Sequence, residues 1–306
     1  MLEKHYKIVA DKPSSSSVKV LDPDGKELEG VVSVAIDPIL PDEPITATVK
    51  VLAELDIEVV DRSEAATSNF DIVYFVKDTL FNEELRYSLR TVERNFPHAS
   101  VVFAGGNPKR ISPDRHITYS QGYGRTKWDN VSSMIRHICR DSRISAQFFL
   151  FNDDFFILKP VKTWTRNFYD GTLADLQNRI VKNNNDSISR YVERLQTGEE
   201  LLREHGYGTK NFELHCPMKI DKNKMLALLD EFGEDAPCKR SLYGNKYFDD
   251  EGGIEMRDNK IALEVGVVNS NDWFVSTLDK SFERGQIGRQ IRGIFTEPSR
   301  FEKEVR

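Results

Sequence analysis

Between residues 70 and 154, apolar strand-like runs alternate with amphipathic helical runs. The strand-like runs lie at 70–76, 100–106 and 147–151, and the helical runs at 82–96 and 128–138. In the first helical run, apolar side chains recur on one helix face, at Leu85, Leu89, Val92 and Phe96. Because parallel strands need crossover helices, this order predicts an α/β fold whose mostly parallel sheet is flanked by helices.

Residues 1–62 have a different pattern of apolar and polar residues. Short alternating apolar runs surround turn sequences such as Asp22-Pro23-Asp24-Gly25, where Pro and Gly stand in positions that a tight turn favours. We therefore expect a small β accessory module over 1–62 and a larger domain over 63–306. The module has no cluster of chemically reactive side chains. We expect it to dock on a partner protein.

Bulk properties exclude several classes of protein. The formal net charge of -6 argues against bulk binding to nucleic acid, so any bound phosphate needs a local cluster of Arg or Lys. The three cysteines have no regular spacing, which argues against a disulfide framework or a zinc ribbon. With no signal peptide and no run long enough to span a membrane, we expect a cytoplasmic protein without a transmembrane segment.

The strongest local signal is Asn152-Asp153-Asp154, which directly follows the third strand-like run. Carboxylates at the carboxyl end of a parallel strand lie where open α/β sheets bind ligands. Asp153 and Asp154 suit Mg²⁺ or Mn²⁺, hard ions that take carboxylate oxygens and bridge phosphates. The competing interpretation is a solvated loop after a strand.

Other candidate residues are weaker when taken singly. Arg86 and Arg90 are four residues apart on one helix face and suit bidentate phosphate binding, although pairing with Glu83 or Glu93 is the commoner outcome. His215 could act as a general base, because its ordinary pKa is near neutrality. The pair Asn271-Asp272, expected after a short strand at 265–268, could add a ligand or cap a helix. A hairpin is expected over 254–263.

Several motifs of other enzyme classes are missing from the sequence. Gly105-Gly106 lacks the spacing of a dinucleotide-binding fingerprint, and no Walker lysine or G-x-S-x-G is present. These absences argue against an ATPase, an α/β-hydrolase and a protease.

The order of the pieces resembles the Stealth family, the capsular-polysaccharide phosphotransferases of bacteria and the related GlcNAc-1-phosphotransferase of animals. The resemblance spans roughly residues 70–306. The segments that carry it are Asp71-Ile72-Val73-Tyr74, Glu84-Leu85-Arg86-Tyr87-Ser88-Leu89-Arg90, Phe151-Asn152-Asp153-Asp154, His215-Cys216-Pro217, Asn271-Asp272 and Glu297-Pro298-Ser299-Arg300-Phe301-Glu302-Lys303. The N-terminal module instead resembles accessory modules of phage-encoded proteins, so a bacterial or phage-infected cell is the expected setting.

The resemblance implies a GT-A-like core that moves a hexose-1-phosphate from a UDP-sugar to a hydroxyl acceptor such as a glycan. It implies metal binding by Asp153, Asp154 and Asp272, and a catalytic role for His215, Asp154 and Arg86. The residues that it assigns to substrate binding are Asp71, Asp78, Arg90, Asn130, Asn152 and Asn271. The chain departs from the family at 75–79, which lacks the usual W-V-D-G, and at 119–125, which lacks the usual His.

Three alternatives to phosphate transfer remain open at this point. A metal-dependent hydrolase would use the same acids on water and would turn over the donor without an acceptor. A GT-A-type glycosyltransferase would pass on the sugar itself and release UDP rather than UMP. A non-catalytic sugar-binding or structural module would bind the nucleotide-sugar without turnover.

Overall fold

The computed structural model describes two compact units, Met1–Asp61 and Arg62–Arg306. The described residues are 7–10, 18–21, 31–36, 47–51, 70–119, 127–161, 164, 166–183, 188–248, 253–269 and 271–303. In the first unit β1 (Lys7–Ala10) pairs with β2 (Val18–Leu21), and β3 (Val31–Ile36) pairs with β4 (Ala47–Val51). Both pairs are antiparallel.

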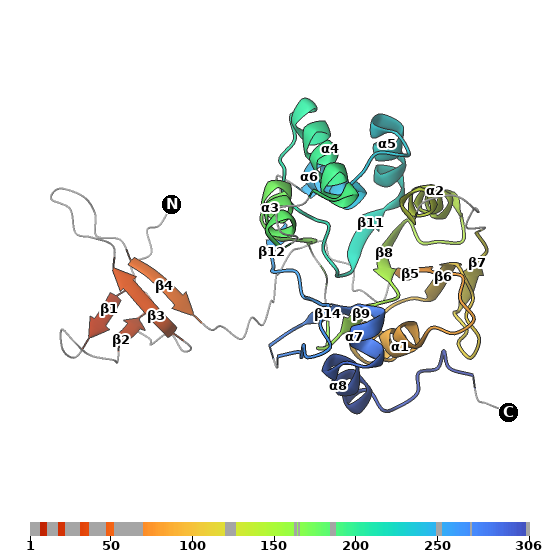
Figure 1. The fold of residues 1–306 in the computed structure, drawn as a ribbon, viewed down its shortest axis with the longest axis horizontal. Helices are drawn as coiled ribbons and strands as arrows, with labels where there is room; N and C mark the ends of the chain where they lie inside the picture. Colours follow the sequence, from red (N-terminus) through yellow and green to blue (C-terminus); the bar gives the residue numbers. More distant parts are fainter. Residues whose placement is uncertain are drawn as a thin grey trace. The chain divides into compact units, whose positions relative to one another are not determined.

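The second unit is built on a five-stranded sheet with the order β11-β8-β5-β6-β7. Its strands are β5 (Asp71–Val76), β6 (Val101–Gly105), β7 (Arg115–Ile117), β8 (Gln147–Asn152) and β11 (Met218–Asp221). All neighbours are parallel except β11, which lies antiparallel to β8 at the edge. The prediction of an α/β fold with a mostly parallel sheet flanked by helices is confirmed (Figure 1).

The helices arise from the periodicities seen in the sequence. They are α1 (Glu83–Asn95), α2 (Lys127–Arg140), α3 (Leu173–Asn183), α4 (Arg190–Glu204), α5 (Lys222–Phe232), α6 (Lys239–Phe248), α7 (Asp279–Glu283) and α8 (Gln286–Ile294). The α1 helix begins after Asn82, whose Oδ1 accepts from the backbone N–H of Leu85 at 2.9 Å. No helix in the described part of the chain is long and apolar enough to cross a bilayer.

The two faces of the central sheet pack into separate apolar cores. Alternate residues of β5 divide between them: Val73 joins the core with α2 and α5, whereas Ile72 and Tyr74 join the core with α1. This is the period-two alternation of a strand that is buried on both faces. The result is a rigid sheet whose strand ends hold the loops that follow them.

A smaller sheet with the order β13-β14-β9 adjoins the first. Here β9 (Phe155–Ile157) runs antiparallel to β14 (Phe274–Thr277), and β13 (Lys260–Ile261) runs parallel to β14. The hairpin expected over 254–263 is therefore wrong, because β12 (Ile254–Glu255) pairs instead with β10 (Phe168–Tyr169). The strand expected at 265–268 is also wrong, since the strand in this region is β14.

The chain order places a topological switch between β5 and β8. After β5 the chain continues to β6 on one side, and it later returns through α2 to β8 on the other side. In open α/β sheets, ligands bind outside the carboxyl ends of strands at such a point. The turn formed by Asp153 and Asp154 connects the carboxyl end of β8 to β9.

Candidate active site

The acidic turn gathers polar side chains from three other elements. Asp153 Oδ2 accepts from Asn82 Nδ2, at the start of α1, at 2.7 Å. Asp154 Oδ2 accepts from Ser276 Oγ of β14 at 2.9 Å and lies 3.3 Å from Lys260 Nζ of β13. The turn is thus fixed by both sheets and by the first turn of α1.

Glu84 adds a third carboxyl group to this cluster. Thr277 Oγ1 of β14 donates to its Oε1 at 2.6 Å. Burial raises the pKa of Glu84 to about 8, and the negative charges of Asp154, Asp279 and Asp153 add to the shift. Burial and the charge of Asp154 likewise raise the pKa of Asp153 to about 6, despite the bond from Asn82. The cluster thus contains two carboxyl groups whose pKa is raised by burial and by neighbouring negative charge.

One oxygen of the cluster has no partner. Asp154 Oδ1 is buried, and no hydrogen bond reaches it from the described residues. A buried carboxylate oxygen without a donor is costly, and a cation or a ligand donor would remove that cost. Within the described ranges, no three His, Cys, Asp or Glu side chains form a metal cage by themselves. The turn fits Mg²⁺ or Mn²⁺ held by Asp153 and Asp154 together with substrate phosphates, as Mg²⁺ is often bound.

His215 forms a second centre with Asp258. Its Nδ1 lies 2.7 Å from Asp258 Oδ2, and its backbone N–H donates to Oδ1 of the same carboxylate at 2.8 Å. Burial would raise the pKa of Asp258, but its bonds to His215 and the charge of Arg240 hold it below its usual range. An ionised Asp258 accepts a hydrogen bond from Nδ1–H, and this tautomer of the imidazole leaves Nε2 as the proton acceptor.

The two centres are joined by a three-residue segment. Asp258 holds His215, and Lys260, two residues later, contacts Asp154. Residues two apart in an extended chain are separated by at most about 7 Å, so this segment keeps the imidazole near the acidic turn. Its middle residue, Asn259, bonds to β14 through both its carbonyl and its side chain, which fixes the spacing.

Arg240, in the first turn of α6, lies between these centres. Its Nη2 donates to the carbonyl of Cys216, next to His215. Its guanidinium carbon is 5.8 Å from the ring centroid of Phe155, which directly follows Asp154. Its Nε is buried and has no hydrogen-bond partner in the described part of the chain. The site therefore contains both an unpaired acceptor, on Asp154, and an unpaired cationic donor.

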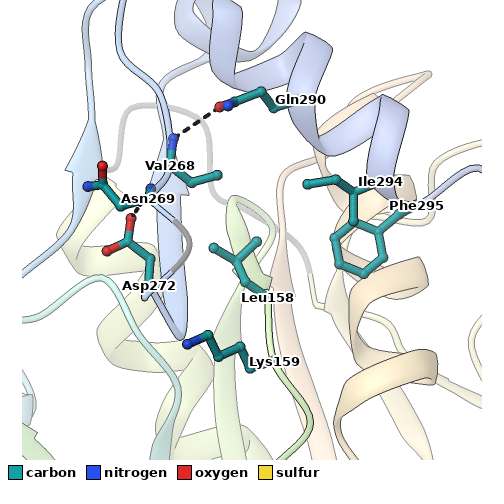
Figure 2. Close-up of a pocket in the computed structure, with 8 residues that line it drawn as sticks. All are labelled: Leu158, Lys159, Val268, Asn269, Asp272, Gln290, Ile294 and Phe295. Carbon is teal, nitrogen blue, oxygen red and sulfur yellow. Dashed lines mark hydrogen bonds between the residues drawn. The ribbon is translucent and has the colours of Figure 1, made fainter. Parts of the chain in front are cut away.

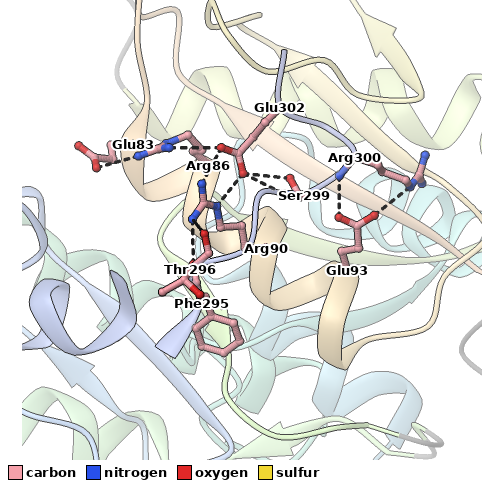
Figure 3. Close-up of polar contacts among 9 residues, drawn as sticks. All are labelled: Glu83, Arg86, Arg90, Glu93, Phe295, Thr296, Ser299, Arg300 and Glu302. Carbon is pink, nitrogen blue, oxygen red and sulfur yellow. Dashed lines mark hydrogen bonds and ion pairs between the residues drawn. The ribbon is translucent and has the colours of Figure 1, made fainter. Parts of the chain in front are cut away.

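The arginines predicted to bind phosphate serve another purpose. Arg90 Nε and Nη2 bond to the two carboxylate oxygens of Glu302 at 2.6 and 2.9 Å, and Nη1 donates to the carbonyls of Phe295 and Thr296 (Figure 3). Arg86 bonds to Glu302 and Glu83. Their expected roles in phosphate binding and catalysis are corrected, because their donors fix the C-terminal segment to α1.

Asp71 is also placed away from the site. It begins β5, at the amino edge of the sheet, and is 2 % exposed. Its carboxylate accepts from Ser100 Oγ and the Ser145 N–H and pairs with Arg115 at 2.6 Å. Parallel strands bring their carboxyl ends to the opposite edge, so the expected role in substrate binding is replaced by cross-linking of loops.

Asn271 and Asp272 precede β14 rather than following a strand. In the pairing of β14 with β9, Ser276 lies opposite Phe155 near the acidic turn, and Phe274 lies opposite Ile157. Asp272 is therefore beyond the far end of β9, where it accepts from the Asn269 N–H at 2.8 Å. It lines a separate cavity of about 240 Å³ beneath α8 (Figure 2). Its expected metal role with Asp153 and Asp154, and that of Asn271 in substrate binding at that site, are wrong.

Besides Asp153 and Asp154, three more predicted residues lie at the carboxyl edge of the sheet. Asn152 is the last residue of β8, and Asp78 is exposed two residues after β5. Asn130 lies in the first turn of α2, whose amino end faces this edge because a crossover helix runs antiparallel to the strands. Their predicted contacts with substrate stay predictions.

Several site residues were not singled out from the sequence. Glu84 belongs to a segment that carries the family resemblance but has no signal of its own, and the sequence predicts a hairpin turn at Asp258. Lys260, Ser276 and Arg240 carry no local signal, because their importance comes from partners far along the chain. Asn82 had one usable signal, since an Asn before an amphipathic run marks a helix start.

A comparison with models of known protein families gives no match to this chain. A search of curated protein sequences gives none either.

Proposed function

We propose that this chain transfers a hexose-1-phosphate from a UDP-sugar to a hydroxyl acceptor with the help of a divalent cation. The observation that carries the proposal is the junction of the acidic turn with the His215–Asp258 pair through Lys260. Within the described residues, this junction combines a carboxylate with an unpaired oxygen, an imidazole nitrogen without a hydrogen-bond partner and an unpaired guanidinium donor. Phosphoryl transfer needs groups of these three kinds.

The diphosphate of the donor is assigned to the acidic turn. Asp153 and Asp154 would hold Mg²⁺ or Mn²⁺, which when bound neutralises charge on the phosphates. Arg240 and Lys260 take the part that the sequence had suggested for Arg86 and Arg90. A guanidinium with an unsatisfied Nε can donate to a phosphate oxygen whose charge grows in the transition state.

His215 is assigned to the acceptor. Its Nε2 takes the proton of the attacking hydroxyl, and Asp258 holds the imidazole and stabilises its positive form. The acceptor oxygen forms a bond to the β-phosphorus of the donor. The bond from that phosphorus to the bridging oxygen breaks, and UMP leaves with the electron pair.

The test is a screen of UDP-sugars with Mg²⁺ or Mn²⁺ and hydroxyl acceptors, in which UMP and UDP are quantified separately. We expect UMP, and we expect Asp154→Ala to lower turnover about 100-fold or more. We expect His215→Gln to lower it about 100-fold, by loss of the base. Asp272→Ala is the matched control, since it removes an acid that lies beyond the far end of β9, and its turnover should stay within about twofold of the wild type.

Each alternative has its own outcome in the same assay. Release of UDP would replace phosphate transfer by glycosyl transfer at the same site. Full turnover by Asp154→Ala would contradict the role given to the acidic turn. Binding of a UDP-sugar without turnover, unchanged by Asp153→Ala, would identify a non-catalytic module.

A further inference from the structure

Basic side chains gather on α4 and at the start of α6, two helices that do not carry the acidic turn. Arg190 and Arg194 lie in the first turns of α4, and Lys239 and Arg240 begin α6. This local concentration of positive charge occurs in a chain whose net charge is -6. Local positive charge in an acidic protein favours an anionic ligand at that place.

Contacts with α2 hold this basic cluster together. The guanidinium carbons of Arg190 and Arg194 lie 5.5 and 4.9 Å from the ring centroid of Trp128. Lys239 Nζ donates to Ser132 Oγ at 2.7 Å and to the Ala236 carbonyl at 2.6 Å. The positions of these cations are thus fixed by contacts among three helices, α2, α4 and α6. Both arginine guanidinium groups contact the indole ring of Trp128.

The cluster is incompletely neutralised. Within the described residues, neither Arg190 nor Arg194 has an ion pair with a carboxylate. Glu213, Asp235 and Glu234 lie within electrostatic reach of Lys239, yet burial and the nearby Arg194 charge lower the pKa of Lys239 to about 8. Cations that repel each other in a half-buried place are stabilised by a bound anion.

Tyr191 connects the cluster to the proposed active site. Burial raises the pKa of its hydroxyl, and the charges of Glu213 and Asp258 act in the same direction while Arg240 opposes them. Tyr191, which neighbours Arg190 on α4, therefore lies within electrostatic reach of Asp258, the carboxylate that holds the imidazole. Figure 1 shows α4 and α6 on one side of β8 and β11, and β9 and β14 on the other.

We propose that Arg190, Arg194 and Lys239 bind a phosphate or carboxylate group of the acceptor, so that the acceptor is an anionic sugar or glycan. This inference rests on the proposed function. The donor diphosphate occupies the acidic turn with Arg240 and Lys260, and His215 receives the proton of the acceptor hydroxyl. The cations of α4 and Lys239 are then left for the remainder of the acceptor.

The experiment measures binding to the full chain without any donor, by titration calorimetry with a hexose 6-phosphate and with the neutral hexose. We expect the phosphorylated sugar alone to bind, and we expect Arg194→Gln to weaken its binding about 10-fold or more, as loss of a charge-assisted bond should. Arg194→Lys should recover part of the affinity, because it keeps the charge without the planar fork. Circular dichroism verifies that the variants are folded.

Arg203→Gln is the matched control, since it removes an arginine from the same helix that is paired with Glu199. Its affinity for the hexose phosphate should be unchanged. Equal binding of neutral and phosphorylated sugar, or equal affinity of Arg194→Gln and Arg203→Gln, would overturn the anion site.

The two proposals fail separately. If UDP-sugars are turned over by an Asp154-dependent route and neutral acceptors serve as well as phosphorylated ones, the acceptor assignment falls and the proposed function stands. If no UDP-sugar is turned over while Arg194 still governs hexose phosphate binding, the proposed function falls, the acceptor role falls with it, and the anion site remains.

Discussion

Helix α1 serves two regions with opposite electrostatic character. At its amino end, Asn82 and Glu84 join a carboxyl cluster in which Asp154 Oδ1 has no partner and two pKa values are raised. One to two turns later, Arg86 and Arg90 meet Glu302, and three guanidinium nitrogens of Arg90 are hydrogen bonded. One end of the helix thus adjoins a carboxyl cluster that has too few hydrogen-bond donors, whereas Arg90 further along has all three guanidinium nitrogens hydrogen bonded.

The difference separates function from stability. Buried carboxyl groups that lack compensation cost folding energy, and such groups are concentrated at functional sites. A saturated ion pair leaves no bond free for a ligand and contributes to holding the chain together. Motif reasoning had assigned Arg86 and Arg90 to the first category, and their contacts place them in the second.

The largest effect is expected from Arg90→Met. Removal of the guanidinium leaves Glu302 largely buried without its bidentate partner, and breaking such a pair costs about 3 kcal/mol. Urea denaturation would measure the loss. Arg94→Met is the control, because Arg94 makes an exposed contact with the carbonyl of Ile294, and its loss should be well under half as large. Equal losses would contradict the difference between the two regions.

An intermediate effect of opposite sign is expected from Glu84→Gln. Because the pKa of Glu84 rises from its ordinary 4.5 to about 8 on folding, the native state keeps a proton that the unfolded chain has lost. Wild-type stability should therefore fall as pH rises from 4.5 to 8, and the variant should be the more stable at pH 8 by about 2 kcal/mol. Urea denaturation at pH 5 and pH 8 checks this. An unchanged pH slope in the variant would show that folding does not raise the pKa of Glu84.

The smallest effect is expected from Glu83→Gln, next to Glu84 on the exposed side of α1. It removes the i,i+3 pair with Arg86, whose solvent-exposed geometry is worth about 0.3 kcal/mol. The same denaturation series at pH 5 and pH 8 should show no change in slope. This variant is therefore the charge-matched control for Glu84→Gln, and a loss above about 1 kcal/mol would contradict the exposed character of the pair.

Much of the fold could be predicted because its causes are local. The apolar face of α1 predicted its limits to within a residue, and the run at 147–151 located β8. The acidic turn was also readable, since it follows a buried strand directly. The smaller sheet was not, because β13 and β14 are short strands that form only through pairing with distant segments.

Part of the candidate site was hidden for the same reason. His215 could be suggested as a base from its chemistry, but its orienting carboxylate, Asp258, lies 43 residues away. The sequence Asn271-Asp272 resembles Asn152-Asp153 and so suggested a metal ligand. In the antiparallel register of β14 with β9, however, Asp272 lies at the end of β9 that is distant from Asp153. Spacing along the chain does not give the distance between side chains that belong to different sheets.

By itself the sequence determined the α/β layout, the main helices and the presence of two acids at a strand end. These features depend on periodicity, capping and burial, which act over a few residues. Only the tertiary structure decided which charges are saturated and which are left without a partner. That outcome depends on long-range pairing: Glu302 neutralises Arg90 across more than two hundred residues, and Lys260 reaches Asp154 from the segment that holds His215.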